Sequence, residues 1–141
     1  MLVLGRPGSG CTSLLRVLSN DRESFDEVAG DTWYGSMDHK EAKRFRQQIM
    51  FNNEDDVHFP TLTVNRTIKF ALRNKVPRER PGHLQNRDDF VQEKRDGILD
   101  SLAIPHTKKT LVGNEFIRGV SGGERKRVSL AEVMAGQVGS I

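Results

Sequence analysis

Cysteine, aromatic residues and long apolar segments are all scarce in this sequence. Its 141 residues contain one cysteine, Cys11, which excludes an internal disulfide. The four histidines, at positions 39, 58, 83 and 106, are widely spread, and no Cys/His spacing typical of a metal site occurs. No apolar run approaches the roughly 18 residues that a membrane-spanning helix needs, and none resembles a signal peptide. These absences predict a segment that faces water, which a membrane protein can also contain.

The composition is that of an ordinary globular segment. Hydrophobic residues make up 35% and charged residues 29% of the chain, and the length allows about one domain. The net charge is +3 with both signs interspersed, so the charge pattern does not indicate a nucleic-acid surface. Met1 lies directly inside the first apolar run, and a further strand could begin at 139–141. We therefore expect a fragment, because so few strands would not bury a complete core.

A glycine-rich loop near the N-terminus is the first motif. It follows the apolar run Met1–Leu4, which predicts a strand, and precedes Leu14–Leu18, which predicts a helix. Strand, glycine-rich loop and helix together are the context of a phosphate-binding P-loop, whose backbone N–H groups hold an anion at the helix N-terminus. The candidate phosphate-binding residues are Gly5, Arg6, Pro7, Gly8, Ser9, Gly10, Cys11, Thr12 and Ser13.

This loop departs from the P-loop pattern at one position. Cys11 stands where the pattern has lysine, and a thiol cannot supply the ammonium that bridges the β- and γ-phosphates. Thr12 keeps the hydroxyl that would coordinate Mg²⁺, and Ser13 could donate to an inner phosphate. The alternative is a Gly/Ser turn between a strand and a helix, with Cys11 as a small buried filler.

Apolar periodicity and turn residues predict the elements between the two motifs. We expect strands over 28–35 and 49–51, a helix over 38–48 and a loop over 52–56. A helix beginning at 62–64 carries Val64, Ile68 and Leu72 at i, i+4 and i+8, which form one apolar stripe.

Prolines mark the ends of the next two helices. Pro77 ends the helix that begins at 62–64, and a polar loop over 78–88 follows. Asp89 is the expected cap of the second helix, which Pro105 ends. Its expected buried residues are Phe90, Val91, Ile98, Leu99 and Leu102.

The second motif opens the last helix. Ser121 is a good N-cap, and Gly122 and Gly123 would expose backbone N–H groups at a helix N-terminus, which is again an anion site. The alternative is a glycine hinge before a capped helix. Arg125–Arg127 are expected on the solvated face of this helix, with contact to a partner domain or a nucleotide as the alternative. The residues Val128, Leu130, Ala131, Val133, Met134 and Ala135 predict deep burial around most of the helix.

Together the motifs resemble the nucleotide-binding domain of ATP-binding cassette (ABC) proteins. Val120, Ser121, Gly122, Gly123 and Glu124 resemble the signature motif of that family, and 53–64 resembles its Q-loop, with Glu54 in the place of the usual glutamine. The combination with Cys11 resembles, more narrowly, the first nucleotide-binding domain of fungal pleiotropic drug resistance exporters of the ABCG class.

The resemblance implies an α/β fold, namely a P-loop NTPase core with an inserted helical subdomain. Residues 1–60 would form the core up to the Q-loop, 61–120 the helical subdomain, and 121–141 the signature helix. The Walker B strand and the switch histidine would lie beyond Ile141, so no residue in this chain is assigned as the hydrolytic base.

The resemblance also implies the cofactors and partners. Gly5–Ser13 would bind ATP, and Thr12 and Glu54 would bind Mg²⁺. The signature would act on ATP held by a second nucleotide-binding domain, so that one site is degenerate and the other hydrolytic. Transmembrane domains of the same multi-pass protein would export hydrophobic drugs or lipids, with this segment on the cytosolic face of the plasma membrane. No nucleic-acid partner is expected.

Other functions stay open at this point. A soluble ABC ATPase acting on nucleic acid or ribosomes would lack membrane helices in its full sequence. A truncated, non-hydrolytic remnant would keep the motifs without activity. A P-loop kinase or GTPase would need the missing lysine and has no use for the Ser-Gly-Gly motif.

Overall fold

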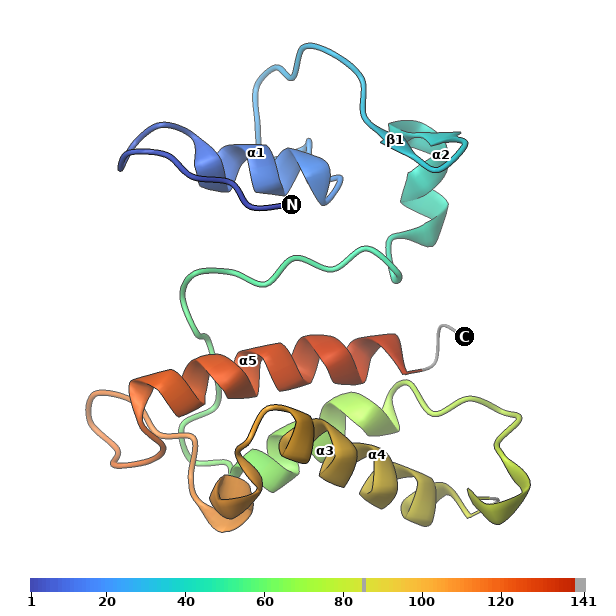
Figure 1. Ribbon diagram of the computed structural model, residues 1–141, viewed down its shortest axis with the longest axis vertical. Coiled ribbons are helices and arrows are strands. Elements are labelled where there is room, and N and C mark those ends of the chain that lie inside the picture. The colour runs from blue at the N-terminus through green and yellow to red at the C-terminus, as the bar shows by residue number, and fades with distance from the viewer. Residues whose placement is uncertain (85, 139–141) are drawn as a thin grey trace. The chain divides into compact units, whose positions relative to one another are not determined.

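Two compact units make up the chain in the computed structural model, which describes residues 1–84 and 86–138 (Figure 1). The first unit is Met1–Phe51 and the second is Asn52–Ile141. Within the described residues, no helix combines the length and the apolar character that crossing a membrane requires. The strand expected to begin at 139–141 lies outside the described residues.

The first unit is a helix followed by a small hairpin. Its elements are α1 (Cys11–Leu18), β1 (Trp33–Tyr34), β2 (Met37–Asp38), α2 (His39–Ala42) and the 3₁₀ helix η1 (Lys43–Phe45). The two strands pair antiparallel, with Trp33 opposite Asp38 and Tyr34 opposite Met37. Gly35, with a φ of +65°, makes the turn that joins them.

Several expected elements of the first unit are shorter or absent. The predictions of strands over 1–4 and 49–51 are wrong for the described chain, the strand over 28–35 shrinks to β1, and the helix over 38–48 becomes α2 and η1. A strand exists only through hydrogen bonds to a neighbour, and no described strand pairs with 1–4 or 49–51. Met1, Leu2 and Leu4 are accordingly exposed.

Three helices form the core of the second unit (Figure 1). Its elements are α3 (Val64–Arg73), the 3₁₀ helix η2 (Gly82–Leu84), α4 (Arg87–Ser101), the 3₁₀ helix η3 (Pro105–Lys109) and α5 (Gly122–Gln137). Helices α3, α4 and α5 pack against one another. The predicted stripe of Val64, Ile68 and Leu72 is confirmed, because all three are almost completely buried in the shared apolar cluster.

Capping residues fix where these helices begin. Thr63 caps α3 by accepting a hydrogen bond from Arg66 N, 3.3 Å away. The expected cap of α4 at Asp89 is wrong, because Asn86 accepts from Asp88 N and starts the helix three residues earlier. Phe90, Val91, Ile98 and Leu99 are buried as expected, and Leu102 is partly buried.

Helix α5 buries a narrower face than its sequence predicts. Val128, Ala131 and Ala135 are fully buried, but Leu130 and Met134 are 39% and 38% exposed. The expectation of burial around most of the helix is therefore wrong. Because α3 and α4 cover one side of α5, only residues at the helical period of that side reach the core.

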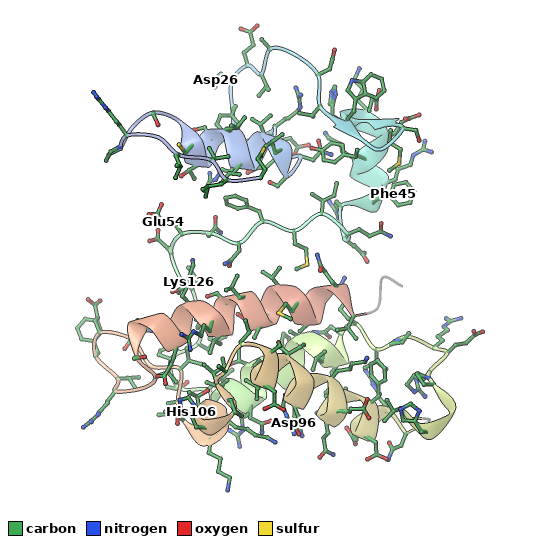
Figure 2. The ribbon with its side chains drawn as sticks, viewed as in Figure 1. Asp26, Phe45, Glu54, Asp96, His106 and Lys126 are labelled. Carbon is green, nitrogen blue, oxygen red and sulfur yellow. The ribbon has the colours of Figure 1, made fainter. Side chains whose placement is uncertain are left out.

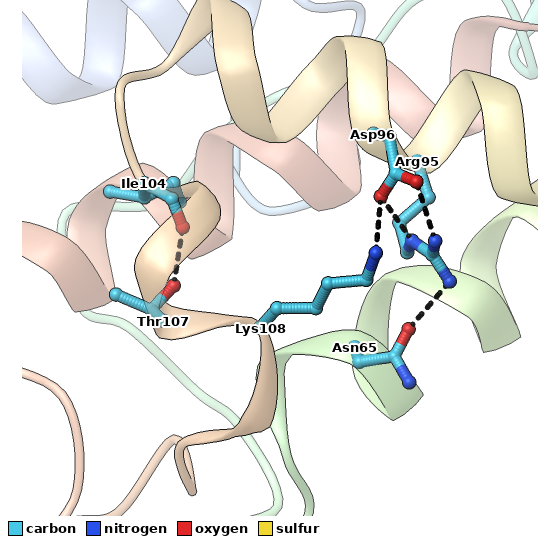
Figure 3. A network of polar contacts seen from close by, with 6 residues as sticks. All are labelled: Asn65, Arg95, Asp96, Ile104, Thr107 and Lys108. Atoms are coloured by element: carbon cyan, nitrogen blue, oxygen red, sulfur yellow. Dashed lines mark hydrogen bonds and ion pairs between the residues drawn. The ribbon is translucent and has the colours of Figure 1, made fainter.

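A buried arginine links α3, α4 and η3 (Figure 3). The Arg95 side chain is only 4% exposed and donates to both carboxylate oxygens of Asp96 at 2.8 and 2.7 Å, and to Asn65 Oδ1 at 2.9 Å. Lys108 Nζ donates to Asp96 Oδ1 at 2.8 Å. The hydrogen bond from Arg95 is the main reason that the pKa of Asp96 falls to about 2. Burying Arg95 is tolerable because its charge is paired.

Candidate functional site

The glycine-rich loop wraps around the N-terminus of α1. Ser9 N donates to Arg6 O at 3.0 Å, and Gly8 and Gly10 have φ angles of +81° and +86°. These left-handed conformations suit glycine, and a Cβ at either position would meet nothing within 4 Å. Gly10 N-caps α1 without a side-chain hydrogen bond, so the first N–H groups of the helix are left for an anion.

Cys11 lies inside this loop rather than on its rim. Its Sγ is 3.4 Å from Ser9 Oγ, and a Cβ built on Gly5 would lie 2.5 Å from that Sγ and 2.2 Å from Ser9 Oγ. A side chain at Gly5 would therefore require the Ser9 and Cys11 side chains to move. The Cys11 thiol is half-buried and carries no positive charge that could face an anion. Thr12 and Ser13 are exposed at the start of α1.

The second motif is placed by a tight loop that precedes α5. Val120 N donates to Leu111 O at 3.0 Å, which sets Val120 in the core. A Cβ at Gly119 would lie 2.4 Å from Val112 O, and Gly113 has a φ of +71°. The chain can make this approach only without side chains at both glycines, and it thereby fixes where Ser121 begins α5.

Ser121 and Glu124 form a capping box at the start of α5. Ser121 Oγ accepts from Glu124 N at 3.4 Å, while Glu124 Oε2 accepts from both Ser121 N and Ser121 Oγ at 2.8 Å. Gly122 and Gly123 are exposed, and a Cβ at either would meet nothing within 4 Å. The N-terminus of α5 is consequently open to a ligand from outside this unit.

His106 completes this helix end. Its Nε2 lies 2.8 Å from Glu124 Oε1, and that hydrogen bond is the main reason that the pKa of Glu124 falls to about 2, ahead of the bonds from Ser121. An ionised carboxylate only accepts, so His106 donates. Sequence reasoning missed the pairing of His106 with the second motif, because 18 residues separate His106 from Glu124.

The Glu54 segment, defined as residues 53–58, is attached to α5 in the same unit. Lys126 Nζ donates to Asn53 O at 2.6 Å and to Glu54 O at 2.9 Å, and lies 3.4 Å from Asp56 Oδ1 (Figure 2). The expectation that Lys126 only faces solvent is therefore wrong. The Glu54 side chain itself is exposed.

A second attachment lies one turn further along α5. Ser129 Oγ donates to Asp56 Oδ1 at 2.5 Å and lies 2.9 Å from His58 Nε2. His58 Nδ1 is 3.0 Å from Glu132 Oε2, and the His58 side chain is only 3% exposed. Lys126, Ser129 and Glu132 recur every three residues, and this polar stripe is the signal in the sequence that could have revealed the contact.

The predicted site residues thus fall into two groups. Gly5–Ser13 cluster around the start of α1 in the first unit, while Val120–Glu124 and Glu54 lie on and beside α5 in the second. Of the two expected Mg²⁺ ligands, Thr12 belongs to the first unit and Glu54 to the second. Among the described residues no three His, Cys, Asp or Glu side chains gather as a metal cluster.

Comparison with family models matches residues 1–139 to the ABC transporter family. Among curated relatives, ABC multidrug transporter G of Aspergillus fumigatus is 83% identical over 137 residues, covering 97% of this chain and 10% of the relative. ABC-type transporter cns4 of Cordyceps militaris is 57% identical over 135 residues, covering 96% and 10%. ABC transporter G family member 21 of Dictyostelium discoideum is 48% identical over 134 residues, covering 95% and 9%. The chain spans about a tenth of the length of these relatives.

Proposed function

The chain belongs to the ABC transporter family and is part of its ATP-hydrolysing domain, and we propose that it serves an asymmetric pair of ATP sites. It contributes a degenerate P-loop to one site and an intact signature motif to the other. The observation that carries this proposal is the contrast between two helix N-termini. At the N-terminus of α1, the glycine-rich loop holds the Cys11 thiol. At the N-terminus of α5, Ser121 caps the helix and leaves the following glycines exposed.

The P-loop site would hold ATP through backbone N–H groups of Gly5–Ser13, with Mg²⁺ on Thr12 and Glu54. When bound, Mg²⁺ would neutralise charge on the β- and γ-phosphates. Cys11 supplies no ammonium, so charge that develops on the γ-phosphate would be poorly stabilised at this site. Nucleotide would therefore bind there and turn over slowly or not at all.

The signature site would act across a domain interface. Exposed N–H groups of Gly122 and Gly123, with the Ser121 hydroxyl, would contact the γ-phosphate of ATP held by the P-loop of a second nucleotide-binding domain. In the present geometry that hydroxyl donates to Glu124, so it would have to turn outward on closure. This half-site adds transition-state donors without supplying the base.

The domain layout and the whole protein follow from the same proposal. Residues 1–60 would form the core up to the Q-loop, 61–120 the inserted helical subdomain, and 121–141 the signature segment, which contains α5. Transmembrane domains of the same multi-pass protein are the partners, with this domain at the cytosolic face of the plasma membrane. Because one relative is named a multidrug transporter, we include hydrophobic drugs or lipids as exported substrates.

The test compares two substitutions in a host transporter. This host is the native full-length protein, or the 83% identical relative with the 137 matched residues of this chain exchanged into it. Ser121→Arg should abolish ATP hydrolysis by blocking the N-terminus of α5, while Cys11→Ala should leave at least about half of it. Ser121→Asn preserves the helix cap and controls for folding.

Equal losses from Ser121→Arg and Cys11→Ala would contradict the asymmetric sites. The hydropathy of the full reading frame tests the transport claim separately. Two blocks of about six spans, with a second P-loop that has lysine, would support an exporter. A frame with no spans would point to a soluble ABC ATPase or a truncated remnant.

A further inference from the structure

We propose that Lys126 is a positioning residue that ties the Glu54 segment to the signature helix and so couples the two nucleotide sites. This inference rests on the proposed function, which places Glu54 at the degenerate site and Ser121–Gly123 at the hydrolytic one. It concerns how Glu54 and the N-terminus of α5, which both belong to the second unit, move together.

The ammonium of Lys126 makes two hydrogen bonds and one ion pair with this segment. A lysine ammonium has three N–H donors, and three oxygens surround Lys126 Nζ: Asn53 O at 2.6 Å, Glu54 O at 2.9 Å and Asp56 Oδ1 at 3.4 Å. Two of these acceptors are backbone carbonyls of consecutive residues. Lys126 therefore sets the path of the main chain at Glu54 and not merely a side-chain orientation.

Ser129 adds a second, more buried contact between α5 and the Glu54 segment. Asp56 Oδ1, which faces Lys126, also accepts from Ser129 Oγ at 2.5 Å, and Ser129 lies 2.9 Å from His58 Nε2. His58 and Ser129 are both largely buried, and Glu132 Oε2 lies 3.0 Å from His58 Nδ1. The hydrogen bond from Ser129 to the Asp56 carboxylate is largely shielded from water, so it holds its geometry better than a surface contact does.

Lys126 and Ser121 are also close along one rigid element. Lys126 lies about one turn beyond Ser121 and Gly122 on α5, a continuous helix of 16 residues. A shift of the helix N-terminus toward the γ-phosphate would therefore carry the Lys126 ammonium with it. The Glu54 backbone, held at two carbonyls, would follow, and nucleotide contact at either site would be felt at the other.

A double-mutant cycle in the host transporter tests this coupling. Lys126→Met keeps the aliphatic stem and removes the donors, and Glu54→Ala removes the side chain that the donors position. We expect Lys126→Met to lower kcat for ATP hydrolysis about fivefold with KM for ATP changed less than about twofold, because ATP at the hydrolytic site is held by the other domain's P-loop. In the Glu54→Ala background the further loss should be below about twofold.

Matched variants separate positioning from damage to the fold. Arg127→Met, on the exposed side of the same helix, should keep kcat within about twofold, and Lys126→Arg, which still offers donors, should restore at least about half of the loss. Ser129→Ala removes the second attachment with little change in volume. Its loss of kcat should likewise be smaller in the Glu54→Ala background. Ser129→Ala therefore provides a second test if the Lys126→Met protein does not accumulate.

The outcomes distinguish this inference from the proposed function. An unchanged kcat in Lys126→Met, or the same fold-loss with and without Glu54, overturns the coupling. The coupling is also overturned if Glu54→Ala leaves ATP hydrolysis unchanged while Ser121→Arg abolishes it. That result would not contradict the asymmetric sites. If Ser121→Arg leaves hydrolysis intact, the proposed function itself fails.

Discussion

Gly119→Ala should dislocate the start of α5 although residue 119 lies outside every helix. The added Cβ would stand 2.4 Å from Val112 O and 2.5 Å from Leu111 O, both backbone atoms that cannot swing aside. Overpacking against main chain costs about 3 kcal/mol, and the loss falls on the hydrogen bond from Val120 N to Leu111 O, now 3.0 Å long. Local opening of the loop should then rise about a hundredfold.

Hydrogen exchange read by mass spectrometry in the host transporter measures this opening. Peptides covering 110–125 should exchange about a hundredfold faster in Gly119→Ala, while peptides of α1 should be unchanged. ATP hydrolysis should fall with them, because Ser121 is no longer held at the start of the helix. Unchanged exchange in the 110–125 peptides would refute the reasoning from close approach.

Two other glycines provide matched controls for the same substitution. Gly97, exposed inside α4, has open space around its Cβ position, so Gly97→Ala should stabilise the helix by about 0.5–1 kcal/mol. Gly122, at the start of α5, is equally open. Gly122→Ala should leave hydrogen exchange of the 110–125 peptides unchanged, because no atom of its own unit lies near the added methyl group. It should still lower ATP hydrolysis, because the methyl group would obstruct a ligand that binds at the N-terminus of α5.

Two further predictions concern the core and its charges. Ile68 is fully buried, so Ile68→Ala should lower the free energy of unfolding by about 2–5 kcal/mol. Phe70 on the same helix is 70% exposed, so Phe70→Ala should change it by less than about 0.5 kcal/mol. Hydrogen exchange of the α3 amides measures both effects. The pKa of Asp96 is about 2 in the folded protein, against an ordinary value of 3.8. Its ionised form therefore stabilises the fold fully above pH 4, and this stabilisation is lost as the pH falls toward 2. Asp96→Asn should abolish that acid dependence and cost about 1–2 kcal/mol after allowance for the half-exposed carboxylate; an unchanged acid profile of α4 exchange would contradict it.

Helices were predictable in this chain because their signals are local. The i, i+4, i+8 stripe of Val64, Ile68 and Leu72 and the cap at Ser121 both appear within a few residues, and the structure confirms both elements. Strands at 1–4 and 49–51 failed because a strand depends on a neighbour that no local pattern names. The capping error at Asp89 arose because Asn86, three residues earlier, offers an equally good side chain.

In the candidate site, too, local features were predictable from the sequence and contacts between distant residues were not. The composition of the P-loop and of the signature predicts an anion-binding backbone, and their roles remain predictions that the proposed experiments address. The contacts that sequence reasoning missed all join distant residues, such as His106 with Glu124 and Lys126 with Asn53, which are 18 and 73 positions apart. No periodicity within one segment reports such a pair, because it forms only when the helices pack.

The polar stripe on α5 also explains why this helix is not buried on all sides. Its apolar face, with Val128 and Ala131, packs into the core, while Lys126 and Ser129 hold the Glu54 segment through hydrogen bonds. From Gly122 to Ser129 the helix rises about 10 Å, a distance over which it bends little. The exposed N-terminus of α5 and the attached Glu54 segment therefore lie on one rigid helix, and we expect them to shift together. The proposed coupling depends on this joint movement, which concerns residues of the second unit.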